Sequence, residues 1–344
     1  MSAFVEVLDG GLGNSIQDAG RPGYRHMGIA SSGFLDPLFA RCANALVGNP
    51  GGAACLEIRG IGPRLRVGQG PLRLALTGNL TASIVRQGGS PQELVAWSTA
   101  TLDSGDCLTV GPVNGGTAYL ALSGGIAVAS ELGSRSTYLR AAIGGLHGRL
   151  PAAGDCLPCA RLGQREYREY QAEPWTHDSG PLHVMLGPQA THFSEAALAE
   201  LLGQPYTVTP ESDRMGMRLS GPRLAHRSAA AADIVSDAVT PGAIQVPGNG
   251  QPIILLADCQ TVGGYPKIAT VISADLPRLG QCRPGEELRF AAVDLEKSAE
   301  ILAAREARWQ AWVNGIRPYL PAGYLDEAAL YQGNLISGMV RADR

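Results

Sequence analysis

Lysine is almost absent from this chain of 344 residues. Lys267 and Lys297 are its only lysines, and the other basic residues are arginine. Basic residues do not exceed acidic ones, and the formal net charge at pH 7 is -3. A broad basic surface of the kind that binds nucleic acid or an acidic membrane is therefore not expected.

Long hydrophobic runs and targeting signals are also lacking. No apolar run reaches the ~20 residues that a membrane-spanning helix needs. The first residues, MSAFVEVLDGG, lack the charged and apolar regions of a secretory signal peptide. The seven cysteines are scattered without the spacing of a disulfide framework. We expect a protein of the reducing cytoplasm.

Several motifs that would point to a cofactor are missing. The chain contains no G-x-x-x-x-G-K-[ST] and no G-x-G-x-x-G after a predicted strand, so any ATP used in its reaction must bind elsewhere. It has no Met-Lys-Met-type site for biotin attachment. The six histidines are dispersed, and Cys156 and Cys159 lack a second pair of ligands. We predict no metal site, and we interpret the two cysteines as ordinary strand residues.

Glycine, in contrast, is abundant. The chain has 45 glycines and 23 prolines, spread along its length rather than gathered in a linker, which predicts many turns and short strands. Three similar segments, SGDCLTVG, AGDCLPCA and PGEELRFA, each predict a glycine turn followed by a strand. In GAIQVPGNGQPIILLAD, the Pro-Gly-Asn-Gly stretch between two apolar runs predicts a hairpin.

Helix signals are few. Capping residues and apolar periodicity predict helices over 36–49, 194–203, 294–313 and 326–340. The fold class is therefore a β-rich α+β protein. A polar, tyrosine-rich stretch at 164–183 separates two β-rich halves, which gives the predicted domains: an N-terminal half over 1–165, a C-terminal half over 180–295 and a helical tail over 296–344. The halves could be intertwined.

One candidate functional region is the glycine-rich segment NSIQDAGRPGYRHMGIASSGFLDP. It contains Gln17, Asp18, Arg21 and Asp36 among four glycines. An irregular glycine-rich backbone lets the main chain approach a ligand or a partner closely. The alternative is a well-knit surface loop in which Asp18 and Arg21 pair with each other. The sequence leaves both interpretations open.

A second candidate region is DCQTVGGYPK. Asp258, Gln260 and Thr261 follow an apolar run, and Tyr265 and Lys267 follow the glycine pair. A partly buried lysine can exchange a proton near neutral pH, whereas an arginine cannot. A site that needs a point charge or a proton donor would explain a lysine here. The alternative is a chance lysine at the start of a strand.

Four segments resemble a known family: SIQDAGRPGYRHMGIASSGFLDP, GSRSTYLRAAIGGLHGR, SDRMGMRL and GAIQVPGNGQPIILLADCQTVGGYPK. They are similar to the biotin-dependent carboxyltransferase-like family, which includes allophanate hydrolase subunit 2, also described as the C subunit of 5-oxoprolinase. The resemblance runs from about residue 5 to residue 295. Met217 and Val262 depart from the family pattern, where tyrosine and threonine are common.

The resemblance implies two cyclophilin-like β-barrel units and a hydrolase subunit that is active only in a complex. In that complex, the A, B and C subunits convert 5-oxoproline to L-glutamate at the expense of ATP, which the complex binds. One alternative is the carboxyltransferase component of a urea carboxylase-like enzyme, with biotin carried by another protein. Another is a regulator that antagonises a B-type kinase inhibitor.

The substrate, a lactam with a carboxylate, calls for a cation and for hydrogen-bond donors at the lactam carbonyl. The residues predicted to be catalytic are Lys267, Asp258 and Gln260. Those predicted to bind substrate are Arg214, Thr261, Tyr265, Gln17, Asp18 and Asp36. A B-type partner implies an exposed apolar surface, for which Trp309 and Trp312 are candidates, although we favour their packing against the chain's own barrel.

Overall fold

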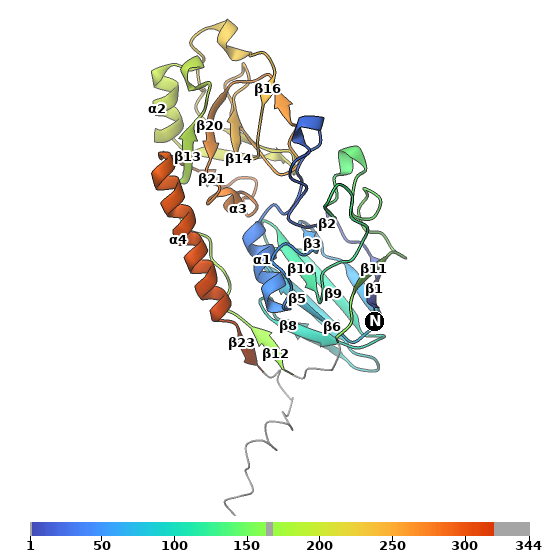
Figure 1. Ribbon diagram of the computed structural model, residues 1–344. Coiled ribbons are helices and arrows are strands. Elements are labelled where there is room, and N and C mark those ends of the chain that lie inside the picture. Colours follow the sequence, from blue (N-terminus) through green and yellow to red (C-terminus); the bar gives the residue numbers. More distant parts are fainter. Residues whose placement is uncertain (1, 163–167, 320–344) are drawn as a thin grey trace, which may run out of the picture.

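A computed structural model describes residues 2–162 and 168–319 of the chain (Figure 1). It contains two β-rich halves, one above the other in this view, with a long helix running along both. The helix predicted over 326–340 lies outside the described residues. No helix in the described part of the chain is both long and apolar enough to cross a membrane.

The first half is built from two antiparallel sheets. Their orders are β11-β1-β4-β9-β6-β7 and β2-β3-β10-β5-β8. The strands are β1 Ser2–Asp9, β2 Ser15–Gln17, β3 Cys55–Ile58, β4 Arg64–Gln69, β5 Leu72–Thr77, β6 Leu80–Val85, β7 Pro91–Leu94, β8 Thr99–Leu102, β9 Cys107–Val113, β10 Ala118–Leu122 and β11 Cys156–Ala160.

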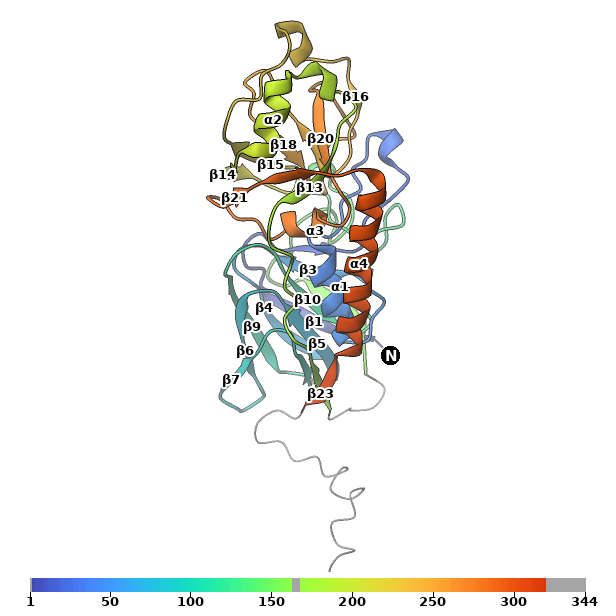
Figure 2. The ribbon, with the colours of Figure 1, turned by 90° about the vertical axis from the view of Figure 1, so that its left-hand side faces the viewer.

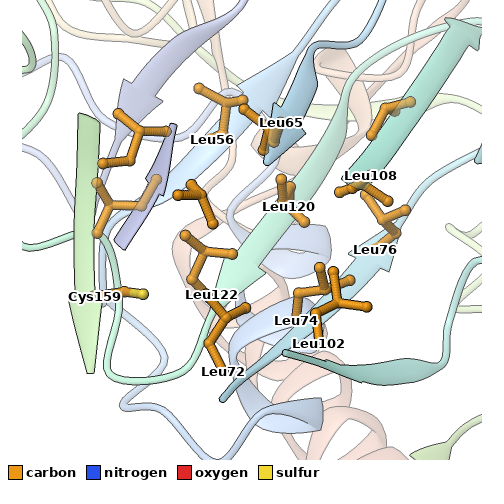
Figure 3. Close-up of a cluster of buried hydrophobic side chains, with 14 of the residues drawn as sticks. Leu56, Leu65, Leu72, Leu74, Leu76, Leu102, Leu108, Leu120, Leu122 and Cys159 are labelled. Carbon is orange, nitrogen blue, oxygen red and sulfur yellow. The ribbon is translucent and has the colours of Figure 1, made fainter. Parts of the chain in front are cut away.

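Leucines fill the space between these sheets (Figure 3). Strand β4 shows the pattern that produces this core, because Leu65 and Val67 are buried while the arginines that alternate with them are exposed. The buried cluster combines both sheets and includes Leu56, Leu72, Leu74, Leu76, Leu102, Leu108, Leu120, Leu122 and Cys159. Burial of this apolar area is what stabilises the first half.

The second half is an eight-stranded sheet that curls into a nearly closed barrel, in the order β21-β14-β15-β18-β17-β20-β13-β22. Only the pairing of β13 with β22 is parallel among its described strands. The strands are β13 Leu182–Leu186, β14 Tyr206–Ser212, β15 Gly216–Ser220, β17 Ala243–Gln245, β18 Ile253–Leu255, β20 Lys267–Val271, β21 Glu287–Leu288 and β22 Phe290–Ala292; a separate pair consists of β16 Asp237–Ala238 and β19 Val262–Gly263.

The helices begin where the sequence predicts them. Helix α1 (Pro37–Leu46) follows Asp36, whose carboxylate accepts the backbone N–H groups of Leu38 and Phe39. Helix α2 (Glu195–Gly203) is capped by Ser194, and α4 (Leu295–Asn314) is capped by Asp294. The remaining helical segments are α3 Leu276–Leu279 and the 3-10 turns η1 Arg25–Met27, η2 Leu139–Ala141, η3 Ala190–His192 and η4 Ala229–Ala232.

After the second half, the chain returns to the first. Figures 1 and 2 both show α4 running from the upper half down beside α1. Trp309 and Trp312 pack against a buried cluster that contains Phe39 and Trp97, which confirms that they pack on the chain's own core. Strand β23 (Arg317–Tyr319) then pairs with β12 (Glu169–Gln171) below the first half.

The three similar turn segments have one geometry. Gly105, Gly154 and Gly285 have φ values of 90°, 91° and 89°, a region that favours glycine, and each precedes a strand or a strand pair. The predicted hairpin is also present, as β17 paired with β18. The β-rich α+β fold with two barrel-like units is thus confirmed. The division into 1–165, 180–295 and 296–344 stays a prediction.

A candidate active site between the two halves

Two adjoining hollows lie where the halves meet. The first, of about 300 Å³, is lined by Gln17 and Tyr138 from the first half and by Arg214 and Asp258 from the second. The other, of about 530 Å³, is lined by Arg140 of the first half and otherwise by residues of the second half, including Gln245, Gln260 and Tyr265. Arg140, Asp213 and Met215 line both hollows, so the two are adjacent, and we call them together the cleft.

Arg214 crosses from the second half to the first. Its Nε lies 2.8 Å from Asp258 Oδ2, its Nη1 pairs with the fully buried Glu57, and its Nη2 donates to the Gly33 carbonyl at 2.6 Å. Burial disfavours the charged guanidinium, but the carboxylates of Glu57 and Asp258 outweigh that penalty and raise the pKa of Arg214. The charge of Arg214 is therefore used to join the halves through Glu57, while Asp258 holds the guanidinium in place.

Glu57 is held by a buried network. Its Oε2 accepts the Leu35 N–H at 2.9 Å and the Tyr119 hydroxyl at 2.8 Å. The same hydroxyl accepts the Asp36 N–H at 2.8 Å. Burial, assisted by Glu57 and Asp36, raises the pKa of Tyr119 well above its ordinary value, so the phenol stays a donor. The network fixes Glu57 beneath the wall of the cleft.

Asp36 lies away from the cleft lining. One of its oxygens caps α1, and Oδ2 accepts the side-chain amide of Gln281 at 2.7 Å and lies 2.7 Å from His177 Nε2. Asp36 is completely buried. The structure places it as a junction between α1 and the second half, while its predicted contact with substrate stays a prediction.

Asp18 shapes the cleft through a neighbouring segment. Its carboxylate accepts the hydroxyls of Ser134 and Ser136, each at 2.6 Å, and the Arg135 N–H at 2.6 Å. Arg21 donates to the carbonyl of Ser136 as well. Asp18 and Arg21 thus both bind the segment that leads directly to Tyr138 in the cleft wall.

Gln17 reaches the cleft from strand β2. Its Nε2 donates to Ser15 Oγ at 3.0 Å and to the Thr137 carbonyl at 3.1 Å, which fixes the amide plane. Its Oε1 is buried and has no hydrogen-bond partner within the described residues. A fixed amide with an unpaired acceptor suits hydrogen bonding to a ligand N–H group.

In the second hollow, the side-chain amides of Gln260 and Gln245 form a chain of hydrogen bonds, which we call the amide relay. Gln260 Nε2 donates to Gln245 Oε1 at 3.4 Å, and Gln245 Nε2 donates to the Tyr265 carbonyl at 3.1 Å. The Tyr265 side chain is exposed at the rim. Thr261 is half-buried, and its carbonyl accepts the Val239 N–H at 3.1 Å. Gln260 and Tyr265 are thus brought together, and Thr261 lies beside them in the chain.

Lys267 lies next to this hollow, opposite Gln245 in the β17–β20 pairing. Its side chain is buried, and Nζ binds Asp237 Oδ2 at 2.7 Å. Gln189 donates to the same carboxylate oxygen at 3.2 Å, and its Oε1 accepts the Lys267 N–H at 3.2 Å. The hydrogen bond from Lys267 lowers the pKa of Asp237, so this carboxylate is ionised at neutral pH.

Two cleft residues escaped prediction from the sequence. Arg140 is exposed and forms no ion pair with any residue that the structure describes. Tyr138 lines the first hollow, and burial together with nearby Asp258 raises its pKa. Both belong to GSRSTYLRAAIGGLHGR, where Ala142 and His147 have φ values of 52° and 56°. These strained positions are visible only in the structure; the signal available in the sequence was the glycine-rich segment itself, one of the four that resemble the family.

The cysteine and histidine patterns offer no competing site. Cys156 is exposed and Cys159 is buried on β11, because residues three apart on a strand point to opposite faces. Over residues 2–162 and 168–319, no group of three or more His, Cys, Asp or Glu side chains is arranged to hold a metal ion.

Comparisons with known proteins agree with this architecture. Residues 27–292 match the family model described as "Carboxyltransferase domain, subdomain A and B". The C subunit of the Escherichia coli 5-oxoprolinase is 34% identical over 306 residues, which cover 88% of this chain and 94% of that protein.

Solved structures show the same fold. The crystal structure of TTHA0988 is 34% identical, with a TM-score of 0.72 over 84% of this chain and 56% of that chain. The present chain thus spans about half of that longer one. The Kluyveromyces lactis urea carboxylase is 27% identical, with a TM-score of 0.79 over 90% of this chain and 29% of that chain.

Proposed function

Because this chain belongs to the carboxyltransferase domain family, subdomains A and B, we propose that it is the C subunit of a cytoplasmic, ATP-dependent 5-oxoprolinase. The observation that carries this proposal is the match to the C subunit of the Escherichia coli 5-oxoprolinase, which covers 88% of this chain and 94% of that protein. The urea carboxylase match covers only 29% of the other chain, where the shared part is one section of a longer protein.

The cleft has groups that suit 5-oxoproline, a five-membered lactam with one carboxylate. Arg140 supplies a cation that no described residue neutralises, and a guanidinium binds a carboxylate through two parallel hydrogen bonds. Gln17 Oε1 is a buried acceptor without a partner among the described residues, and we assign the lactam N–H to it. These groups lie along the same cleft, so a ligand of this class could be held at both ends.

Opening the lactam places negative charge on its carbonyl oxygen. Fixed hydrogen-bond donors aimed at that oxygen stabilise the transition state. Tyr138 is suited to this role, because its raised pKa keeps the phenol protonated at neutral pH. The side-chain amide of Gln260 at the other hollow is a second donor.

Lys267 and Asp258 have different places in this proposal. The ammonium group of Lys267 binds Asp237, and Lys267 lies opposite Gln245 in the strand pairing. From this position its positive charge acts on the hydrogen-bonded side-chain amides of Gln245 and Gln260. Asp258 is bound by Arg214 and therefore acts by holding the wall of the cleft rather than as a free base. ATP binding is assigned to the A- and B-type partner subunits, since the chain carries no nucleotide-binding motif.

Reconstitution tests the proposal. The chain is mixed with A-type and B-type subunits, and glutamate release from 5-oxoproline is measured with and without ATP. Glutamate should appear only when all three subunits and ATP are present. 2-Pyrrolidinone, which lacks the carboxylate, should be a much poorer substrate. A full, stable assembly that releases no glutamate would overturn the proposal.

Carboxyl transfer is the second candidate, because the Kluyveromyces lactis urea carboxylase shares the fold with a TM-score of 0.79. This activity requires a biotinylated partner, since the present chain has no attachment site for biotin. A streptavidin blot of the complex isolated from the native host distinguishes the two candidates. A biotinylated component, together with incorporation of labelled bicarbonate into urea, would favour carboxyl transfer.

A further inference from the structure

A separate cavity of about 400 Å³ lies between the two halves, and we call it the α1–α3 cavity. Figure 2 shows α1 and α3 facing each other at this level of the molecule. Its walls come from both halves and are largely apolar: Phe34, Leu35, Leu255, Leu256, Leu276 and Leu279. None of these residues lines the 5-oxoproline cleft except Leu255, which also borders its second hollow.

The charge at this cavity is already neutralised. Among the described residues that line it, Arg41 is the only cation, and both its terminal nitrogens bind Glu306, at 2.9 and 2.7 Å. The same guanidinium lies 3.6 Å from the ring centre of Trp309 on α4. A charged ligand would lose its hydration here without gaining a free counter-charge, so the lining selects a neutral molecule.

One polar group in the lining lacks a partner. Ser32 lines the cavity and is 8% exposed, and its buried hydroxyl has no hydrogen-bond partner within the described residues. Buried hydroxyl groups are normally hydrogen-bonded, so Ser32 Oγ lacks a partner of the kind that a polar ligand atom or a water molecule supplies.

The backbone holds that hydroxyl in place. Ser32 has a φ of 53°, and its N–H donates to the Ala257 carbonyl of the second half at 3.0 Å. The backbone of Gly20 packs directly against that of Ser32, so that a Cβ at Gly20 would lie only 2.9 Å from the Ser32 carbonyl oxygen. A strained residue that is fixed from two sides is typical of a binding site.

From these observations we infer that the α1–α3 cavity binds a small, neutral, mainly apolar organic molecule that carries one hydroxyl, carbonyl or amide group toward Ser32 Oγ. The serine hydroxyl can donate or accept, so each of these groups is a suitable partner. Because the walls belong to both halves, the ligand stabilises their contact. This inference is independent of the proposed function.

Three probes of similar shape test the ligand class on the full chain: benzyl alcohol, toluene and benzoate. Binding is followed by saturation-transfer NMR and by the shift of the thermal unfolding midpoint with ligand concentration. Benzyl alcohol should bind saturably and more tightly than toluene, and benzoate should not bind. Equal binding of all three, or no saturable binding of benzyl alcohol, would overturn the inference.

Two matched pairs of variants locate the binding site. Ser32→Ala removes the hydroxyl and should weaken benzyl alcohol binding about five- to tenfold, the worth of one hydrogen bond, while leaving toluene binding unchanged. Ser31→Ala, outside the lining, should change neither. Leu276→Trp fills the cavity and should abolish binding of both probes, whereas Leu186→Trp, at an exposed position, should not. Undiminished binding in Leu276→Trp would place the site elsewhere.

Discussion

Arg214 of the second half and Glu57 of the first form a buried ion pair, although 157 positions separate them in the sequence. Asp258 shares the same guanidinium. Because Arg214 both lines the cleft and holds the two halves together, a substitution there changes the stability of the fold as well as the cleft. Stability and turnover therefore have to be measured separately for each variant.

Truncation of Arg214 should destabilise the fold strongly. Arg214→Ala leaves the carboxylate of Glu57 buried without its counter-charge, which should cost about 3–5 kcal/mol of unfolding free energy. Urea unfolding measures this loss. Arg218→Ala removes an exposed arginine four positions further along the chain, on β15, and should change stability by less than about 0.5 kcal/mol. Similar losses in both variants would contradict the role of Arg214 in joining the halves.

The two lysines form a natural matched pair. Lys267→Met keeps the length of the side chain but removes the charge that Asp237 binds, and in the assembled complex it should lower glutamate release about tenfold or more. Lys297→Met removes an exposed lysine paired with Glu300 on α4 and should leave turnover unchanged. If Lys267→Met assembles normally and retains full turnover, the lysine has no part in catalysis.

Arg140 should act mainly in substrate binding. Loss of a carboxylate–guanidinium contact in Arg140→Ala should raise KM for 5-oxoproline about ten- to a hundredfold, with a smaller effect on kcat. Steady-state kinetics of the complex give both constants. The control is Arg66→Ala, an exposed arginine that pairs with Glu6 on the sheet of the first half. A fall in kcat alone would assign Arg140 a different role.

The Tyr138 phenol should lose its proton at a higher pH than an ordinary tyrosine. Burial and nearby Asp258 raise its pKa, so the phenolate absorbance that is lost in Tyr138→Phe should appear with a midpoint above the ordinary value of about 10. The folded state then holds this proton more tightly than the unfolded state. Its contribution to stability is therefore present below about pH 10 and declines above it. A difference titration centred at or below about 10 would show that burial does not control this phenol.

The tryptophans of α4 should control how firmly the helix is held. Trp312 donates to the Glu173 carbonyl at 2.7 Å and lies edge-on to Trp97, 6.2 Å between ring centres. Trp312→Ala should cost about 2–4 kcal/mol and speed amide exchange along α4. Leu295→Ala, at a position that is 71% exposed on the same helix, should do neither. Unchanged exchange in both variants would mean that other contacts retain the helix.

Local signals in the sequence sufficed for much of the fold. Asp36, Ser194 and Asp294 are short polar side chains that cap a helix within their own segment, so their roles follow from neighbouring residues. The glycine turns before β9 and β11 depend on one residue each. Such features need no knowledge of distant parts of the chain.

The cleft was harder to predict because its residues act through distant partners. The sequence marks Arg214 and Asp258 as polar residues near an apolar strand, but only the fold shows that they neutralise each other and Glu57. Arg140, in contrast, looks ordinary in the sequence and gains its importance from lying between two hollows. Whether a charged side chain is neutralised depends on the residues around it in the folded structure, which need not be its neighbours in the sequence.

The pairing of β23 with β12 has a consequence for synthesis on the ribosome. Glu169 pairs with Tyr319, so the strand that completes this two-stranded sheet leaves the ribosome only after the entire second half. Until then the surface around Trp97 and Phe39 lacks the cover of α4. The nascent first half thus exposes an aromatic patch during translation, which makes it a natural client for chaperones that recognise apolar surface.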